Sequence, residues 1–176
     1  EAQENVAIQV AEQISDYLIN GAVVNALNMP SITAEESKIM TPWLLLAGHL
    51  GTFVGQLTQE PIKAINILYD GSVSSMNLEA LNCSVIAGIM RTSNPDVNLV
   101  SAPIVAKDRG IKISTTTQDK SGVFAAYIKV TVVTETMERS VAGTVFSDDK
   151  PRFIQIKGIN IDAEVGQHML YTTNVD

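Results

Sequence analysis

The sequence is poor in cysteine, aromatic residues and long apolar runs, and each shortage excludes a class of protein. Cys83 is the single cysteine, so no disulfide can form within the chain and a cysteine-based metal cluster is not supported. It falls inside an apolar helical pattern, which predicts a buried, inert thiol. A lone thiol of this kind fits a reducing compartment, and we expect the protein to be cytoplasmic.

Membrane and nucleic-acid partners are not expected. The apolar run from Trp43 to Leu50 is far shorter than the ~20 residues that a membrane helix needs. Lys and Arg number 12 against 19 Asp and Glu, and the net charge is −7, which argues against a broad nucleic-acid footprint. Hydrophobic residues make up 45% and aromatic residues 5%, which predicts a folded domain with an aliphatic core.

Residues typical of catalysis and cofactor binding are also scarce. The chain has no Gly-x-Ser-x-Gly elbow, no His-Glu-x-x-His, no EF-hand spacing, no Walker lysine and no Gly-x-Gly-x-x-Gly loop. His49 lies beside an apolar helical stripe, so we expect a partly buried or interface histidine rather than a base. His168 has no evident partner in the sequence. We therefore expect no catalytic, cofactor or metal residues, and an independent small enzyme is only a remote alternative.

The first half of the sequence has helical periodicity. Residues 2–20 form an amphipathic pattern that Gly21 closes, and residues 43–57 and 78–89 carry two further apolar stripes. Thr33 with Glu36 has the capping-box form, and Thr41 followed by Pro42 predicts a second helix start. Asn77 and Ser101 are the predicted N-caps of the next two helices, the second of which spans 103–109 and ends at Gly110. A strand is predicted at 62–69.

The second half alternates with a period of two, as strands do. Strands are predicted near 111–114, 124–132, 141–145, 153–157 and 169–173. Because no helices separate them, they should pair largely antiparallel through hairpins. The predicted fold is α+β: N-terminal helices followed by a mainly antiparallel sheet with helices packed on one face.

Positive charge is the remaining candidate for function. Lys107, Arg109, Lys112 and Lys120 lie close together in the sequence, and Arg152 belongs to a second basic group that also holds Arg139, Lys150 and Lys157. Several of these side chains could converge on one sheet edge, and Arg suits bidentate recognition of carboxylate or phosphate. Two interpretations stay open: a solvated basic edge that balances the acidic residues, or a pocket for a small anion.

Seven runs spread over nearly the whole chain carry a family resemblance: residues 1–7, 13–18, 28–31, 97–113, 119–122, 139–146 and 154–160. No single run is a chemical motif, but jointly they are specific. With them the chain resembles the C-terminal part of the long form of D-3-phosphoglycerate dehydrogenase. That family consists of NAD-dependent oxidoreductases of L-serine biosynthesis.

The resemblance implies a division of the chain. Residues 1–29 look like the terminal helix of the catalytic half, 33–167 like the intervening, or allosteric substrate-binding, domain, and 168–176 like the first strand of an ACT regulatory domain. The family's catalytic histidine, arginine, glutamate and nucleotide-binding loop have no counterpart here. The start at Glu1 without a methionine and the end at Asp176 directly after a strand-like run suggest a piece of a larger protein.

The resemblance also implies functional residues and partners. Arg152 matches a basic position that binds an anion in some members, whereas the next basic position falls on Glu164, which is acidic here. Asn174 and Asp176 match positions flanking the serine site of the ACT domain. We expect a non-catalytic regulatory and oligomerisation unit without its own cofactor, bound to the catalytic half of the same polypeptide, which uses NAD. The expected partners are further copies of the chain in a homo-oligomer and a small effector, either a phosphate-bearing anion or serine. The alternative is a structural spacer without a ligand.

Overall fold

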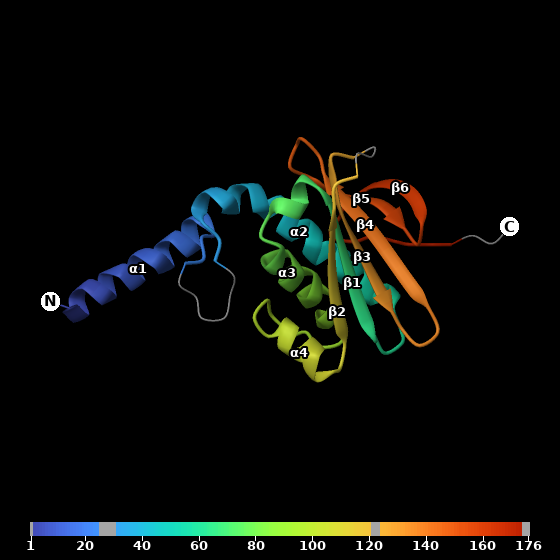
Figure 1. Cartoon of the computed structure of the whole chain (residues 1–176), viewed down its shortest axis with the longest axis horizontal. Coiled ribbons are helices and arrows are strands. Elements are labelled where there is room, and N and C mark those ends of the chain that lie inside the picture. Colours follow the sequence, from blue (N-terminus) through green and yellow to red (C-terminus); the bar gives the residue numbers. More distant parts are fainter. Residues whose placement is uncertain (1, 25–30, 121–123, 174–176) are drawn as a thin grey trace.

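A mixed β-sheet with helices on one face forms the body of the protein, in a computed structural model that describes residues 2–24, 31–120 and 124–173. The helices are α1 (Ala2–Asn20), α2 (Ala34–Leu57), α3 (Leu78–Arg91) and α4 (Ala102–Asp108), and a 3₁₀ turn covers Ser72–Ser75. The strands are β1 (Ala64–Gly71), β2 (Lys112–Gln118), β3 (Ala126–Val133), β4 (Glu138–Val145), β5 (Pro151–Ile156) and β6 (Ile159–Glu164). The predicted α+β class is confirmed (Figure 1).

The strand order across the described part of the sheet is β2-β1-β3-β4-β5-β6. Pairing is antiparallel from β1 through β3 to β6, as predicted. The first pair is different, because β2 runs parallel to β1. A parallel pair needs a long crossover between its strands, and the segment that carries α3 and α4 provides it. The sheet is therefore mostly, but not entirely, built from hairpins.

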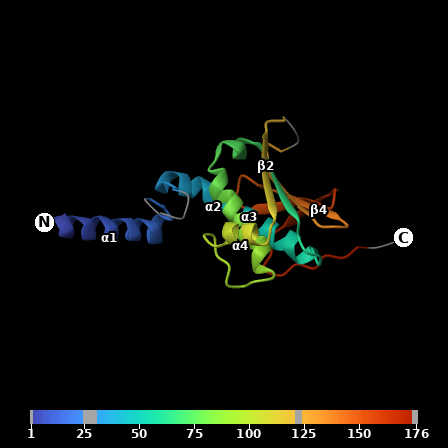
Figure 2. The same cartoon turned by 60° about the horizontal axis from the view of Figure 1, so that its bottom comes forward.

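The core lies between the sheet and the two helices α2 and α3. Leu46 and Leu50 of α2 and Ile128 and Val130 of β3 are fully buried there. The alternate residues of β3, Tyr127 and Lys129, point to the opposite face, which we call the outer face and which the helices leave open (Figure 2). This alternation follows from the two-residue period of a strand.

The helix α2 begins at the predicted capping box and then continues through the predicted second start. The side chain of Thr33 accepts a hydrogen bond from the N–H of Glu36, and the carboxylate of Glu36 accepts one from the N–H of Thr33. The prediction of a new helix at Thr41 is wrong, because Pro42 lies inside one continuous helix. The hydroxyl of Thr41 donates to the carbonyl of Ser37 at 2.6 Å instead of capping.

Two other predicted caps have different outcomes. Asn77 caps α3 by accepting a hydrogen bond from the N–H of Ala80 at 3.1 Å, as expected. Ser101 precedes α4 but makes no capping bond, because its hydroxyl instead accepts from the N–H of Asn98 at 3.0 Å. Gly110 closes the α4 segment with φ of +71°, a conformation that glycine adopts without strain.

The end of the sheet differs from the prediction. Residues 169–173 form no strand, and the last strand is β6, which the sequence reading did not predict. The sequence signal for β6 was Gly158 between two alternating runs, and in the structure Lys157 and Gly158 both have positive φ in the tight turn between β5 and β6. The alternation of Ile159, Ile161 and Ala163 with polar residues completes the strand pattern.

The N-terminal helix α1 projects from the body (Figure 1). Its amphipathic pattern was predicted, and Gly21 closes it with φ of +69°. However, its apolar side chains are exposed: Val6 is 59% exposed and Leu18 is 75% exposed. The helix therefore contributes little to the core of the body.

Candidate functional site

Arg152 lies on the outer face of β5, where its guanidinium is already engaged. Its Nη1 donates to the carboxylate of Asp162 on β6 at 3.1 Å, and its guanidinium carbon lies 5.1 Å from the ring centre of Phe146. Its Nε is buried and has no hydrogen-bond partner among the described residues. Only part of this guanidinium therefore remains available to another acceptor.

Acidic side chains surround the other cations at this edge. Glu164 stands directly across from Arg152 in the register of β5 and β6. Its carboxylate lies 3.6 Å from Nζ of Lys150, which is an ion pair between half-exposed side chains. Two cations and two carboxylates thus balance one another in this β5–β6 edge cluster, defined as Lys150, Arg152, Asp162 and Glu164. An incoming anion has to compete with both carboxylates.

The other predicted basic residues lie at the opposite side of the sheet. Lys107 is on α4, Lys112 begins the edge strand β2, and Lys120 follows the end of that strand. Arg109 donates from Nη1 to the hydroxyl of Ser93 at 2.7 Å. All four are exposed.

The two basic groups do not converge. Strand β2 is the first in the sheet order and β5 is the fifth, so three strands lie between them. Neighbouring strands are about 4.8 Å apart, which separates the two groups by roughly 19 Å across the sheet. Asn174 and Asp176 lie outside the described residues.

A buried carboxylate near Lys120 is a feature that the sequence reading missed. Asp70 is 3% exposed at the end of β1. Burial by itself raises the pKa of Asp70, but hydrogen bonds from the N–H of Lys120, from Gln118 and from Tyr127 hold it below its ordinary value of 3.8. The only sequence signal was the Asp70-Gly71 turn pair, and this carboxylate closes the turn rather than facing a ligand.

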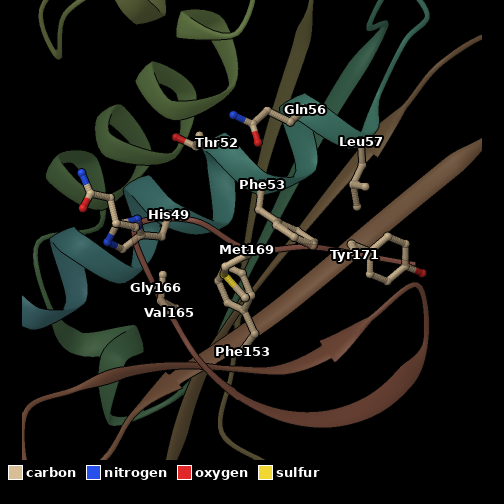
Figure 3. Close-up of a pocket in the computed structure, with 11 residues that line it drawn as sticks. His49, Thr52, Phe53, Gln56, Leu57, Phe153, Val165, Gly166, Met169 and Tyr171 are labelled. Carbon is tan, nitrogen blue, oxygen red and sulfur yellow. The ribbon is translucent and has the colours of Figure 1, made fainter. Parts of the chain in front are cut away.

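A second missed feature is a hollow between α2 and the C-terminal segment (Figure 3). Its volume is about 370 Å³. Successive turns of α2 supply one wall and the segment from Val165 to Tyr171 supplies the other. The ring centres of Phe53 and Phe153 are 5.0 Å apart, and Tyr171 meets Phe53 edge-on at 6.1 Å. These aromatic contacts hold the C-terminal segment against α2.

The side chains with polar groups in this hollow are those of His49, Thr52, Gln56, Gln167 and Tyr171, and no carboxylate or lysine or arginine is among the lining residues. Burial lowers the pKa of His49, which favours the neutral form of the imidazole. A neutral imidazole without an orienting carboxylate can donate and accept hydrogen bonds but lacks the usual support of a general base. By its accessible surface His49 is an exposed residue that lines the hollow, so the prediction of a partly buried histidine is not confirmed.

The remaining candidates carry little chemistry. The sequence predicted a buried thiol at Cys83, but this residue is only half-buried. Its partial burial raises the pKa of the thiol, and the nearby negative charge of Glu79 raises it further. Within the described residues, no group of three or more His, Cys, Asp or Glu is arranged to hold a metal ion. None of the helices in the described part of the chain is long and apolar enough to cross a membrane.

The chain is similar to known proteins along its whole length. Residues 39–157 match the family model described as D-3-phosphoglycerate dehydrogenase intervening domain. All of the chain aligns with D-3-phosphoglycerate dehydrogenase of Bacillus subtilis at 29% identity, covering 34% of that protein. It aligns equally fully with the Synechocystis enzyme of the same name at 31% identity, covering 32% of it. For the enzyme of Methanocaldococcus jannaschii the identity is 29%, over 92% of the chain and 30% of the relative. The chain spans about a third of the length of these relatives.

Proposed function

The chain belongs to the family of D-3-phosphoglycerate dehydrogenase intervening domains, and from this we propose that it is a non-catalytic regulatory and assembly unit of such a dehydrogenase. In this proposal the hydride transfer to NAD takes place in a separate catalytic half of the same polypeptide. The intervening domain transmits the binding of an effector to that half and contributes to contacts between subunits.

The observation that carries the proposal is the position of the matched region within the molecule. The family match covers the body of the protein, and α1 and the C-terminal segment leave that body on opposite sides (Figure 1). The matched residues 39–157 run from α2 to the end of β5. Figure 1 shows α1 projecting from one side and the C-terminal segment leaving on the other. A body with connections at opposite sides is suited to couple two neighbouring domains.

The exposed stripe of α1 supports a contact with the catalytic half. Val6, Ile14 and Leu18 are each more than half exposed, although their spacing is that of a helix with one buried face. We propose that residues 1–29 are the terminal helix of the catalytic half, which covers this stripe. Residues 33–167 are then the intervening domain and 168–176 the start of an ACT domain.

The proposed effector is a phosphate-bearing or other small anion at Arg152. The support is the guanidinium of Arg152, whose side chain is 25% exposed and lies in one cluster with the exposed Lys150. Lys107, Arg109, Lys112 and Lys120 form a separate, exposed group, which favours their interpretation as a solvated basic edge. A role of Asn174 and Asp176 in serine binding depends on the rest of an ACT domain.

Calorimetry on this chain tests the proposal. We expect saturable binding of phosphohydroxypyruvate or inorganic phosphate, and a loss of roughly tenfold or more in Arg152→Ala, since a hydrogen bond to a charged group contributes about 1.5–3 kcal/mol. The control Lys38→Ala removes an exposed cation from α2 and should leave the affinity unchanged. We also expect no hydride transfer with 3-phosphoglycerate and NAD. Measurable turnover would contradict a non-catalytic role.

The second candidate is a structural spacer without a ligand. It is favoured by the ion pair between Arg152 and Asp162, in which the protein supplies its own carboxylate to the guanidinium. Calorimetry that detects no binding of phosphate, phosphohydroxypyruvate or serine, together with a stable dimer or tetramer in solution, would support the spacer over the regulatory unit.

A further inference from the structure

A hollow on the outer face of the sheet lies beside the β5–β6 edge cluster, shares no lining residue with it and has a different chemistry. Its volume is about 510 Å³, which is within the usual range for a small-molecule site. Lys129 on β3, Ala142 on β4 and Gln155 on β5 lie in one row across the strands and line it. Phe124 and Tyr127 add aromatic surface.

The hollow is a consequence of strand irregularity and of a small residue. In the pairing of β4 with β5, Gly143 faces Phe153 and Ala142 faces Gln155, so Ile154 is an extra residue on β5. A bulge of this kind redirects side chains: Ile154 lies on the face opposite the core residue Phe153, and Gln155, one residue further on, also lines the hollow instead of returning to the core. Ala142, with its single methyl group, leaves the space between Lys129 and Gln155 unfilled.

Lys129 provides a cation that no described residue neutralises. Its partners on the adjacent strands are Leu68 and Ala142, which are both apolar. The nearest buried carboxylate on the same face, Asp70, already accepts hydrogen bonds from Gln118 and from the N–H of Lys120. The hydroxyl of Tyr127 is bonded to Gln118, so Tyr127 offers its ring to the hollow. No Asp or Glu lines this space.

From this arrangement we propose that the outer-face hollow binds a small monocarboxylate with an aromatic or branched apolar body. The carboxylate pairs with the ammonium group of Lys129. The apolar body lies over Ala142, against Phe124, Tyr127 and Ile154. At the far end, Gln155 donates to the amide oxygen of Asn160 at 3.0 Å, which leaves the oxygen of Gln155 and the amide nitrogen of Asn160 for a polar substituent.

The proposal is tested by calorimetry or NMR titration of this chain with 4-hydroxybenzoate, phenylacetate and 4-methylpentanoate. We expect saturable binding of at least one of them, weakened about tenfold or more in Lys129→Met, because a charge-assisted contact in a partly desolvated site contributes on this scale. Ala142→Leu should block binding by filling the hollow. The uncharged analogue 4-hydroxybenzyl alcohol should bind about tenfold more weakly than 4-hydroxybenzoate.

Two controls separate this site from the one proposed at Arg152. Lys38→Met makes the same substitution at an exposed position on α2 and should leave the carboxylate affinity within about twofold. Arg152→Ala should weaken phosphate binding but not carboxylate binding, so that either site can fail alone. Absence of saturable binding for all three carboxylates to the folded protein would overturn the inference, as would equal affinity in the wild type and Lys129→Met.

Discussion

At the scale of single residues, the charge balance around Arg152 decides how strongly an anion can bind. Asp162 holds the guanidinium at 3.1 Å, and Glu164 occupies the facing position on β6. Both carboxylates are more than half exposed, so each interaction is screened by water and is weak. In the proposed function these two carboxylates therefore weaken the binding of an anion at the edge cluster without preventing it.

Removing either carboxylate should raise the affinity for inorganic phosphate. We expect Glu164→Gln and Asp162→Asn each to tighten binding by roughly two- to fivefold, since exposed ion pairs contribute about 0.2–1 kcal/mol. Calorimetry with phosphate measures the change. Glu138→Gln, which removes an exposed carboxylate at the far end of β4, is the matched control and should have no effect. Unchanged affinity in both edge variants would argue against binding at Arg152.

The lowered pKa of Asp70 should appear in the acid stability of the protein. A carboxyl whose folded pKa lies below its unfolded value of about 3.8 stabilises the fold above that value, and this stabilisation is lost as the pH falls through the folded pKa. We therefore expect the free energy of unfolding to fall less between pH 5 and pH 3 in Asp70→Asn than in the wild type. Urea unfolding followed by the fluorescence of Trp43 measures it.

The exposed neighbour Asp119 supplies the comparison for that experiment. Asp119→Asn should retain the pH dependence of the wild type. Equal pH dependence in Asp70→Asn and the wild type would mean that the hydrogen bonds from Gln118 and Lys120 do not select the ionised form of Asp70.

At the scale of elements, the packing of α2 on α3 depends on small residues at their crossing. A Cβ added to Gly51 would lie 2.2 Å from the carbonyl oxygen of Val85, and one added to Gly88 would lie 2.4 Å from the carbonyl oxygen of Gly48. These contacts involve backbone atoms, which cannot move aside without shifting a helix. The close approach of the two helices therefore requires glycine at both positions.

Alanine at Gly51 should destabilise the protein. We expect a loss of about 1–3 kcal/mol in the free energy of unfolding, which is the usual cost of overpacking. Gly48→Ala in the same helix is the matched control, because its Cβ would meet only the hydroxyl of Ser84, at 3.3 Å. That variant should be neutral or up to about 1 kcal/mol more stable, since alanine favours the helix. Equal effects of the two substitutions would contradict the close packing at Gly51.

At the scale of the whole molecule, the apolar side chains fall into two groups: those buried in the core of the body and those exposed on the projecting helix α1. Val85 on α3 is fully buried, whereas Val6 on α1 is 59% exposed. Only the first contributes burial to the folding of this chain. The second is available to another partner, which in the proposed function is the catalytic half.

The same substitution at these two valines should separate the two roles. Val6→Asp should change the free energy of unfolding by no more than about 0.5 kcal/mol, as is usual for surface positions. Val85→Asp should lose several kcal/mol, because it buries an unpaired charge. Urea unfolding with Trp43 as the probe compares them, since Trp43 is the single tryptophan and lies in the body. A loss above about 1 kcal/mol for Val6→Asp would mean that α1 packs on the body.

The sequence by itself determined the features that depend on neighbours within a few residues. The capping box at Thr33, the cap at Asn77, the glycine at 110 and the alternation through β3 were predicted because helix caps, turns and strand periods are local. The family was recognisable for a similar reason, since its runs are read directly along the chain. The α+β class followed from the change of period between the two halves.

The tertiary structure decided everything that depends on which distant segments meet. It placed Lys112 and Arg152 on strands separated by three others, set Asp162 against Arg152, and paired β2 in parallel with β1. It continued α2 through Pro42 as one helix. It also placed Lys129 between two apolar neighbours, Leu68 on β1 and Ala142 on β4. Strand order and register are chosen by burial of the whole core, and a local pattern contains no information about the far side of that core.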